Sequence, residues 1–217
     1  MMRSLVLTAL VVVLAGASAA VFYLARNIDQ IPDDKFYRDK VAWYQANPAS
    51  GRVVILGDSI VWRGKWNQEL PDCDMVMRGV EWETTAGLLA RVDEIIRVGA
   101  ETAVVMVGTN DLSYTQQDSA IFGRYRQIIN RLNRTAKVIV VSTTLRDAKQ
   151  NDANVRIRKL NSALERECGS GSCTFMDLNA EIAPTGYLLP EYTTDGIHLT
   201  PAAYECWRAM LIGPIGC

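Results

Sequence analysis

The chain of 217 residues contains a single histidine, His198, and an aspartate lies three residues before it in the segment DGIHLTPAAY. Within one turn, the carboxylate of Asp195 can accept the Nδ1 proton of this histidine, fix its tautomer and stabilise the imidazolium. The Nε2 atom is then free to take a proton from a serine. Ser59, in the segment VVILGDSI, is the candidate. Together the three residues predict acyl transfer through a serine nucleophile.

Ser59 also has a purely structural interpretation. It lies between an apolar run and a stretch, VWRGKWNQEL, that can form a helix, and a serine at such a place often serves only as the helix N-cap. A lone histidine on a loop is likewise commonly a surface residue. The nucleophile elbow GxSxG is excluded, because that motif needs glycine at position 61, where Val61 stands. The nucleophile hypothesis therefore depends on His198 reaching Ser59.

Acyl transfer also needs hydrogen-bond donors for the negative oxygen of the tetrahedral intermediate. The candidates for such an oxyanion hole are the backbone N–H groups of Ser59 and Gly79 and the side-chain amide of Asn110. Their structural alternatives are a turn for Gly79 and a helix cap for Asn110. One histidine is few for a transition-metal hydrolase, so the sequence predicts neither a metal nor a cofactor.

These residues need a scaffold, and the sequence indicates a parallel sheet. Five short apolar runs alternate with amphipathic segments whose apolar residues recur at helical spacing. This order is typical of an α/β protein with three layers, α/β/α, whereas a closed eightfold barrel needs more βα units. Ligands bind beyond the carboxyl ends of such strands, and the candidate residues all follow a run. The runs cover residues 52–56, 75–78, 103–107, 137–142 and 174–178.

Four sequence blocks together resemble one known family, the SGNH hydrolase (GDSL esterase/lipase) superfamily. They occur in the family's order, and the resemblance covers residues 50–212. It implies a flavodoxin-like fold with five parallel strands and metal-independent hydrolysis of carboxylic esters. The blocks are GDS at 57–59, Gly79 in RGVEWETT, GTND at 108–111 and DGIHLTPAAY at 195–204. The roles that the resemblance implies are a triad of Ser59, Asp195 and His198 and an oxyanion hole of Ser59, Gly79 and Asn110.

The second block departs from the family pattern. Many members have an asparagine two residues before the glycine and a Ser-Gly pair two residues after it, whereas this chain has Met77, Glu81 and Trp82. The backbone N–H of Gly79 is expected to remain, but bulk and charge beside it change the substrate pocket. The three tryptophans Trp62, Trp66 and Trp82 can line an acyl or sugar site. The alternative is that they pack against the sheet.

The N-terminal segment differs from the rest of the chain. No charge occurs from Leu5 to Ala25, a length sufficient for a membrane-spanning helix. Residues 1–26 are therefore interpreted as a membrane anchor or as a signal peptide cleaved near Ala19, and the two remain open. Residues 27–35 are expected to be a linker, followed by one domain at 36–217. Either interpretation predicts an exported protein, anchored in the inner membrane and facing the periplasm, or periplasmic or secreted after cleavage.

Five cysteines suit an oxidising compartment. The segment CGSGSC at 168–173 is a small loop that a disulfide can close, and Cys206 with Cys217 is the second candidate pair, which leaves Cys73 over. The alternative is that these residues are free thiols packed as small hydrophobic groups.

The bulk composition excludes one class of partner. The formal net charge is -1 and no basic run occurs, so the chain lacks the electrostatic footprint of a nucleic-acid-binding protein. The expected partner is a small-molecule ester, an acyl lipid or an acylated carbohydrate, with the membrane added if the N-terminal segment is uncleaved. Two alternatives keep the same fold: an O-acyltransferase acting on envelope carbohydrate, and a non-catalytic binding module.

Overall fold

The computed structural model describes residues 31–113 and 117–217. The chain divides into two units, Met1–Gln30 and Ile31–Cys217, and the described helices and strands all belong to the second. The predicted signal peptide or anchor, with residues 27–30 of the predicted linker, lies outside the described residues. Across the described ranges, no helix combines the length and apolar character needed to cross a membrane.

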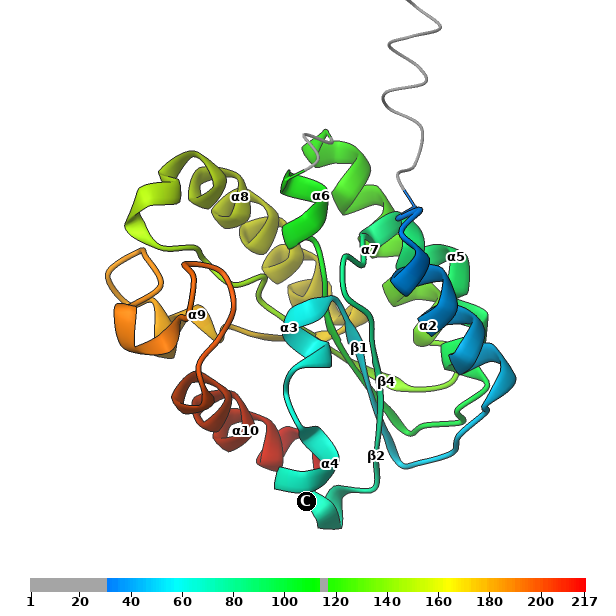
Figure 1. The fold of residues 1–217 in the computed structure, drawn as a ribbon. Coiled ribbons are helices and arrows are strands. Elements are labelled where there is room, and N and C mark those ends of the chain that lie inside the picture. The colour runs from blue at the N-terminus through cyan, green and yellow to red at the C-terminus, as the bar shows by residue number, and fades with distance from the viewer. Residues whose placement is uncertain (1–30, 114–116) are drawn as a thin grey trace, which may run out of the picture. The chain divides into compact units, whose positions relative to one another are not determined.

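One sheet of five parallel strands forms the centre of the domain (Figure 1), in the order β2-β1-β3-β4-β5. This confirms the predicted α/β fold with its five-stranded parallel sheet, and each predicted run overlaps one strand. β1 and β3 are buried along their whole length, which explains their continuous apolar sequences. The strands are β1 Val53–Gly57, β2 Met75–Gly79, β3 Thr102–Met106, β4 Lys137–Val141 and β5 Thr174–Met176.

Helices cover the sheet, and the amphipathic segments form the longest of them. In α7 the apolar residues at helical spacing face inward, with Ile121, Tyr125 and Ile128 fully buried. α5 packs against α7 and α7 against α8, whereas α4 contacts α10 through Trp66 and Trp207. The helices are α2 Lys35–Ala46, α3 Ser59–Trp62, α4 Trp66–Glu69, α5 Thr85–Ile96, α6 Thr109–Ser113, α7 Asp118–Leu132, α8 Asn151–Glu167, α9 Asn179–Ile182 and α10 Pro201–Ile215.

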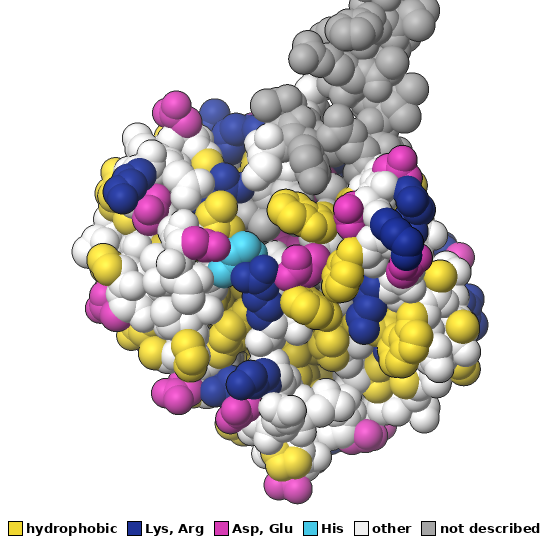
Figure 2. Space-filling model, in the orientation of Figure 1, with side chains coloured by type: hydrophobic (Ala, Val, Ile, Leu, Met, Phe, Trp, Pro, Cys, Tyr) yellow, Lys and Arg dark blue, Asp and Glu magenta, His cyan; other side chains and the backbone are white. Residues whose placement is uncertain are grey.

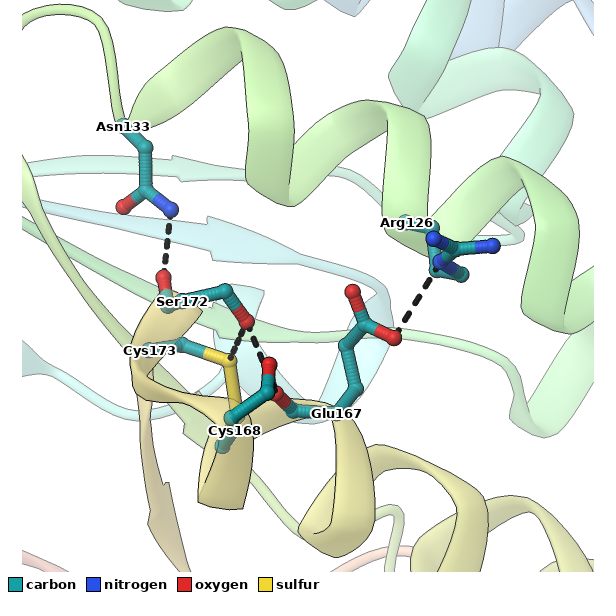
Figure 3. Close-up of a disulfide and its surroundings, with 7 residues drawn as sticks. Arg126, Asn133, Glu167, Cys168, Ser172 and Cys173 are labelled. Carbon is teal, nitrogen blue, oxygen red and sulfur yellow. Dashed lines mark hydrogen bonds and ion pairs between the residues drawn. A yellow bond between two sulfur atoms is a disulfide. The ribbon is translucent and has the colours of Figure 1, made fainter.

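The predicted small disulfide loop is confirmed. Cys168 and Cys173 are bonded and close the turn between α8 and β5 (Figure 3). Neighbouring contacts fix this turn to α7: the amide of Asn133 donates to the carbonyl of Ser172, and Arg126 forms an ion pair with Glu167 at 3.1 Å. The loop therefore ties the last strand to the helix layer.

The predicted pairing of Cys206 with Cys217 is wrong. Cys206 lies inside α10 and Cys217 just beyond its end, so a straight helix separates them by roughly 15 Å, more than a disulfide can span. Cys217 instead bonds to Cys73, whose Cα lies 5.3 Å away, and Cys206 is the free thiol. The bond joins the C-terminus to the short turn that leads into β2.

A buried ion network lies behind the carboxyl end of β2. The guanidinium of Arg91 on α5 contacts the carboxylates of Glu83, at 2.6 Å, and Glu94, at 3.2 Å. Arg78 on β2 also binds Glu94, at 2.5 Å, and the hydroxyl of Tyr37 on α2 donates to Glu83 at 2.9 Å. The network joins β2, α2 and α5 to the loop that carries Glu83.

Candidate active site

Ser59, His198 and Asp195 lie in one hydrogen-bonded chain, as the sequence predicts. The Oγ of Ser59 is 3.1 Å from the Nε2 of His198, and the Nδ1 of His198 is 2.6 Å from a carboxylate oxygen of Asp195. Ser59 begins α3 directly after β1, and the other two residues precede α10. Figure 2 shows the histidine, in cyan, reaching the surface between acidic and basic side chains.

Ser59 is not the cap of its helix. Asp58 is the N-cap of α3, and its carboxylate accepts a hydrogen bond from the N–H of Ile60 at 2.9 Å. Burial raises the pKa of Asp58 to about 7, and the bond from Ile60 opposes that rise. Because the neighbouring residue supplies the cap, the hydroxyl of Ser59 is left to bind His198.

The loop that carries the histidine is held by its own hydrogen bonds. A carboxylate oxygen of Asp195 accepts from the backbone N–H groups of Ile197, at 3.0 Å, and His198, at 2.8 Å. Partial burial favours the neutral acid, but the bonds from the His198 ring and from these N–H groups outweigh it and lower the pKa of Asp195 to about 2. The carboxylate is thus ionised at neutral pH and can stabilise a charged imidazole ring.

Asn110 also lies at the site, on α6 beyond the end of β3. It is the second residue of α6 and so does not stand at the N-cap position, and its side-chain nitrogen donates to the carbonyl of Glu83 at 2.9 Å. An amide nitrogen carries two protons, and this bond uses one of them. The same pocket contains Asn110, Ser59 and His198, so the second proton is available for a bound substrate.

Gly79, the third predicted oxyanion residue, does not line this pocket. Its N–H donates to the sulfur of Met77 at 3.1 Å. A Cβ atom at position 79 would lie 2.5 Å from the backbone nitrogen of Trp62, so glycine is needed for the close packing of α3 on β2. The structure therefore does not bring Gly79 together with Ser59 and Asn110, and its oxyanion role stays a sequence-based prediction.

Trp82, three residues after Gly79, lies at the pocket where Gly79 does not. It lines the pocket with Ser59 and Asn110, and its φ of 67° lies in the left-handed region that favours glycine. No described residue accepts a hydrogen bond from its N–H. The sequence does mark this position, because Trp82 stands where many members of the family have the glycine of the Ser-Gly pair.

The pocket is small, and only one of the three predicted tryptophans lines it. Its volume is about 230 Å³, below the range usual for drug-sized ligands. Trp66 is buried, with its indole N–H donating to the carbonyl of Val61 at 2.7 Å, and serves as core packing. Trp62 lines a separate groove with Trp43. Residues of the pocket that the sequence analysis missed are Arg63, Thr109, Ser113, Arg146 and Ile197.

Fold and site together are typical of serine hydrolases: a parallel sheet whose carboxyl edge carries serine, histidine and aspartate in hydrogen-bonding contact. A family model, the GDSL-like Lipase/Acylhydrolase family, matches residues 55–206. The chain belongs to this family.

Known proteins resemble the chain at low identity. A GDSL-like lipase from Bacteroides thetaiotaomicron shares 24% identity and a TM-score of 0.71, over 83% of this chain and 97% of that one. An acetylxylan esterase from Geobacillus stearothermophilus shares 12% identity and a TM-score of 0.64, over 78% of this chain and 96% of that one. These likenesses show the fold. An N-acylneuraminate cytidylyltransferase from Streptococcus agalactiae is 25% identical over 125 residues, which are 56% of this chain and only 30% of that protein.

Proposed function

We propose that the protein hydrolyses carboxylic esters outside the cytoplasm, with Ser59 as the nucleophile. His198 acts as general base and acid, and Asp195 orients it. One observation carries the proposal: the hydrogen bonds of 3.1 and 2.6 Å that connect the serine hydroxyl, the imidazole and the carboxylate. Membership of an acylhydrolase family supports an ester as the substrate.

The reaction follows from this geometry in two steps. The Oγ of Ser59 attacks the ester carbonyl while its proton moves to the Nε2 of His198, which then protonates the departing alcohol. Water, deprotonated by the same nitrogen, attacks the acyl-serine and releases the acid. Asp195 stays ionised through both steps and stabilises the charged imidazole.

The negative oxygen of each tetrahedral intermediate needs donors already in place. Ser59 is the first residue of α3, where N–H groups have no acceptor within the helix. Asn110 and Trp82 line the same pocket, and the second amide proton of Asn110 and the N–H of Trp82 have no acceptor among the described residues. We assign these three groups to the oxyanion hole.

The acyl group is proposed to be short. The pocket of about 230 Å³ is below the range usual for drug-sized ligands, which favours an acyl group of a few carbons over a long chain, and the half-exposed Trp82 is among its lining residues. The structural likeness to an acetylxylan esterase agrees with a small acyl group.

An exported location is supported by the disulfides. Cys73–Cys217 and Cys168–Cys173 are both formed, and such bonds persist in oxidising compartments. The uncharged segment from Leu5 to Ala25 agrees with export by anchor or signal peptide.

A fluorophosphonate probe tests the proposed nucleophile. The activated hydroxyl displaces fluoride from phosphorus, so we expect one adduct per chain by intact mass and, after digestion, its location on Ser59. Labelling is expected to vanish in Ser59→Ala and to slow strongly in His198→Ala. An unlabelled wild-type protein, or equal labelling of Ser59→Ala, would contradict the proposal.

Asn110→Ala is expected to lower kcat by about 10²- to 10³-fold with a small change in KM, because one oxyanion donor is lost. The measurement is steady-state hydrolysis of 4-nitrophenyl acetate. Asn67→Ala, at an exposed position on α4, is the matched control and should keep wild-type kcat. A wild-type kcat for Asn110→Ala would remove Asn110 from the oxyanion hole.

A further inference from the structure

Arg146 lies buried beside the proposed nucleophile without an acidic partner. Its side chain is only 8% exposed and lines the pocket that contains Ser59 and His198. Its four hydrogen bonds go to uncharged acceptors: the carbonyl and hydroxyl of Thr109, the hydroxyl of Ser113 and the amide oxygen of Gln150. A buried charge of this kind is costly unless an anion balances it.

The other buried arginines each form an ion pair with at least one carboxylate. Arg78 and Arg91 both bind Glu94, and Arg91 also binds Glu83. Arg124 binds Asp111 at 3.3 Å. Among the residues that the structure describes, Arg146 is the one buried arginine with no carboxylate partner. Its charge is thus left unbalanced within the protein.

Arg146 retains a donor for a ligand. Three of its bonds go from Nη2, so Nη1, with the single partner Gln150 at 3.2 Å, keeps one proton for a ligand, whereas Nε is buried and unpaired. The backbone is fixed by Asn154, whose side chain accepts from the N–H of Arg146 at 2.7 Å and donates to its carbonyl at 2.9 Å. The guanidinium is therefore held in place before any substrate binds.

The rest of the pocket does not neutralise this charge. Arg63 is also there, but it forms its own ion pair with Glu81 at 2.8 Å. Thr109, Ser113 and Asn110 contribute polar groups without charge. Burial lowers the pKa of Arg146, with no acidic group acting against that effect. The site therefore offers one unbalanced positive charge to whatever binds beside Ser59.

We propose that the substrate is an ester that carries an anionic group, and that Arg146 binds this group while Ser59 attacks the carbonyl. The inference rests on the proposed ester hydrolysis and names its substrate class. A carboxylate fits the planar guanidinium. It can belong to the acyl part, as in a half-ester of a dicarboxylic acid, or to the alcohol part, as in an acetylated hydroxy acid.

Matched pairs of esters distinguish these sources and separate the inference from the proposed function. For the acyl part, mono-(4-nitrophenyl) glutarate is compared with 4-nitrophenyl butyrate. For the alcohol part, 4-acetoxybenzoate is compared with 4-acetoxybenzamide. Rates are corrected with Ser59→Ala as the blank. We expect wild-type kcat/KM to favour the anionic member of one pair by about 10- to 100-fold, the effect of hydrogen bonds to a charged group.

The variant Arg146→Met is expected to remove this preference, leaving the neutral esters much less affected, and Arg146→Lys to restore part of it. Arg134→Met, which removes one exposed positive charge elsewhere, should keep the full preference. Equal losses on both members of each pair would mean that Arg146 only positions the loop with Thr109, and would overturn the inference. So would the absence of any preference in the wild-type protein.

A binding measurement tests recognition of the anion independently of ester hydrolysis. Calorimetric titration of Ser59→Ala with 4-acetoxybenzoate and mono-(4-nitrophenyl) glutarate reports recognition without turnover. We expect one of them to bind at least tenfold more tightly than its neutral counterpart, and Ser59→Ala/Arg146→Met to lose this difference. Thermal unfolding checks that each variant is folded. If the anion binds through Arg146 but the wild-type protein hydrolyses no ester, the proposed function fails and the anion site stands.

Discussion

Replacing Ser59 with alanine is expected to lower kcat for 4-nitrophenyl acetate by about 10⁶-fold, as removal of a serine nucleophile does in other triads. The hydroxyl lies 3.1 Å from Nε2 of His198 and no described neighbour replaces it there. Because the backbone N–H groups and Asn110 remain, binding and oxyanion stabilisation should leave a residual rate about 10³-fold above that in water.

The variant is also expected to fold normally. Asp58 caps α3 without help from the serine side chain, so the midpoint of urea unfolding should change little. Ser119→Ala, at an exposed position of α7, is the matched control and should keep full activity. A Ser59→Ala protein that is folded and retains more than a few per cent of wild-type kcat would show that this serine is not the nucleophile.

The fold was predictable because its signals are local. Apolar runs such as 103–107 are buried on both faces, so their hydrophobicity is continuous and easily recognised. The helix after β3 shows the 3.6-residue period of a one-sided face, from Ile121 to Leu132. The strand order follows from neither signal, since it depends on crossovers between distant segments. Only the resemblance to a family with a flavodoxin-like fold carried information about it.

The meeting of Ser59, Asn110 and His198 in one pocket was predictable for a different reason. Ser59, Asn110 and His198 each follow a strand or precede a helix, and the carboxyl edge of a parallel sheet brings such positions together. An oxyanion N–H is harder to predict, because every residue but proline has one. Gly79 is a glycine so that it can pack on α3, whereas Trp82, in a turn with positive φ, lines the pocket.

Contacts between residues far apart in the sequence could not be predicted from the sequence alone. Arginine is mostly a surface residue, so neither the burial of Arg146 nor that of Arg91 is visible in composition or spacing. Cys217 pairs with a residue 144 positions away in the sequence, a contact that only the placement of α10 beside the turn at Cys73 produces. These features depend on the completed fold, because each joins segments that are far apart in the sequence.

Arg91→Leu is expected to lower the free energy of unfolding by about 3 to 5 kcal/mol, the effect of removing one partner from a buried ion pair. The guanidinium binds Glu83 at 2.6 Å, Glu94 at 3.2 Å and the carbonyl of Arg78 at 2.6 Å. Without it, the fully buried Glu83 loses its cation. Burial already raises the pKa of Glu83, and Arg91 opposes that rise. Equilibrium urea unfolding measures the loss.

Arg97→Leu, an exposed arginine at the end of α5, is the control and should change stability by less than about 0.5 kcal/mol. Double-mutant cycles with Glu83→Gln separate the ion pair from general packing, because neutralising both partners should cost less than the sum of the single changes. Strict additivity would contradict a direct pair.

The carbonyl of Glu83 also holds Asn110, so Arg91→Leu should lower kcat as well, even when the variant is studied well below its unfolding transition. Equal kcat in the Arg91 variant and the wild type would show that Asn110 keeps its place without this network.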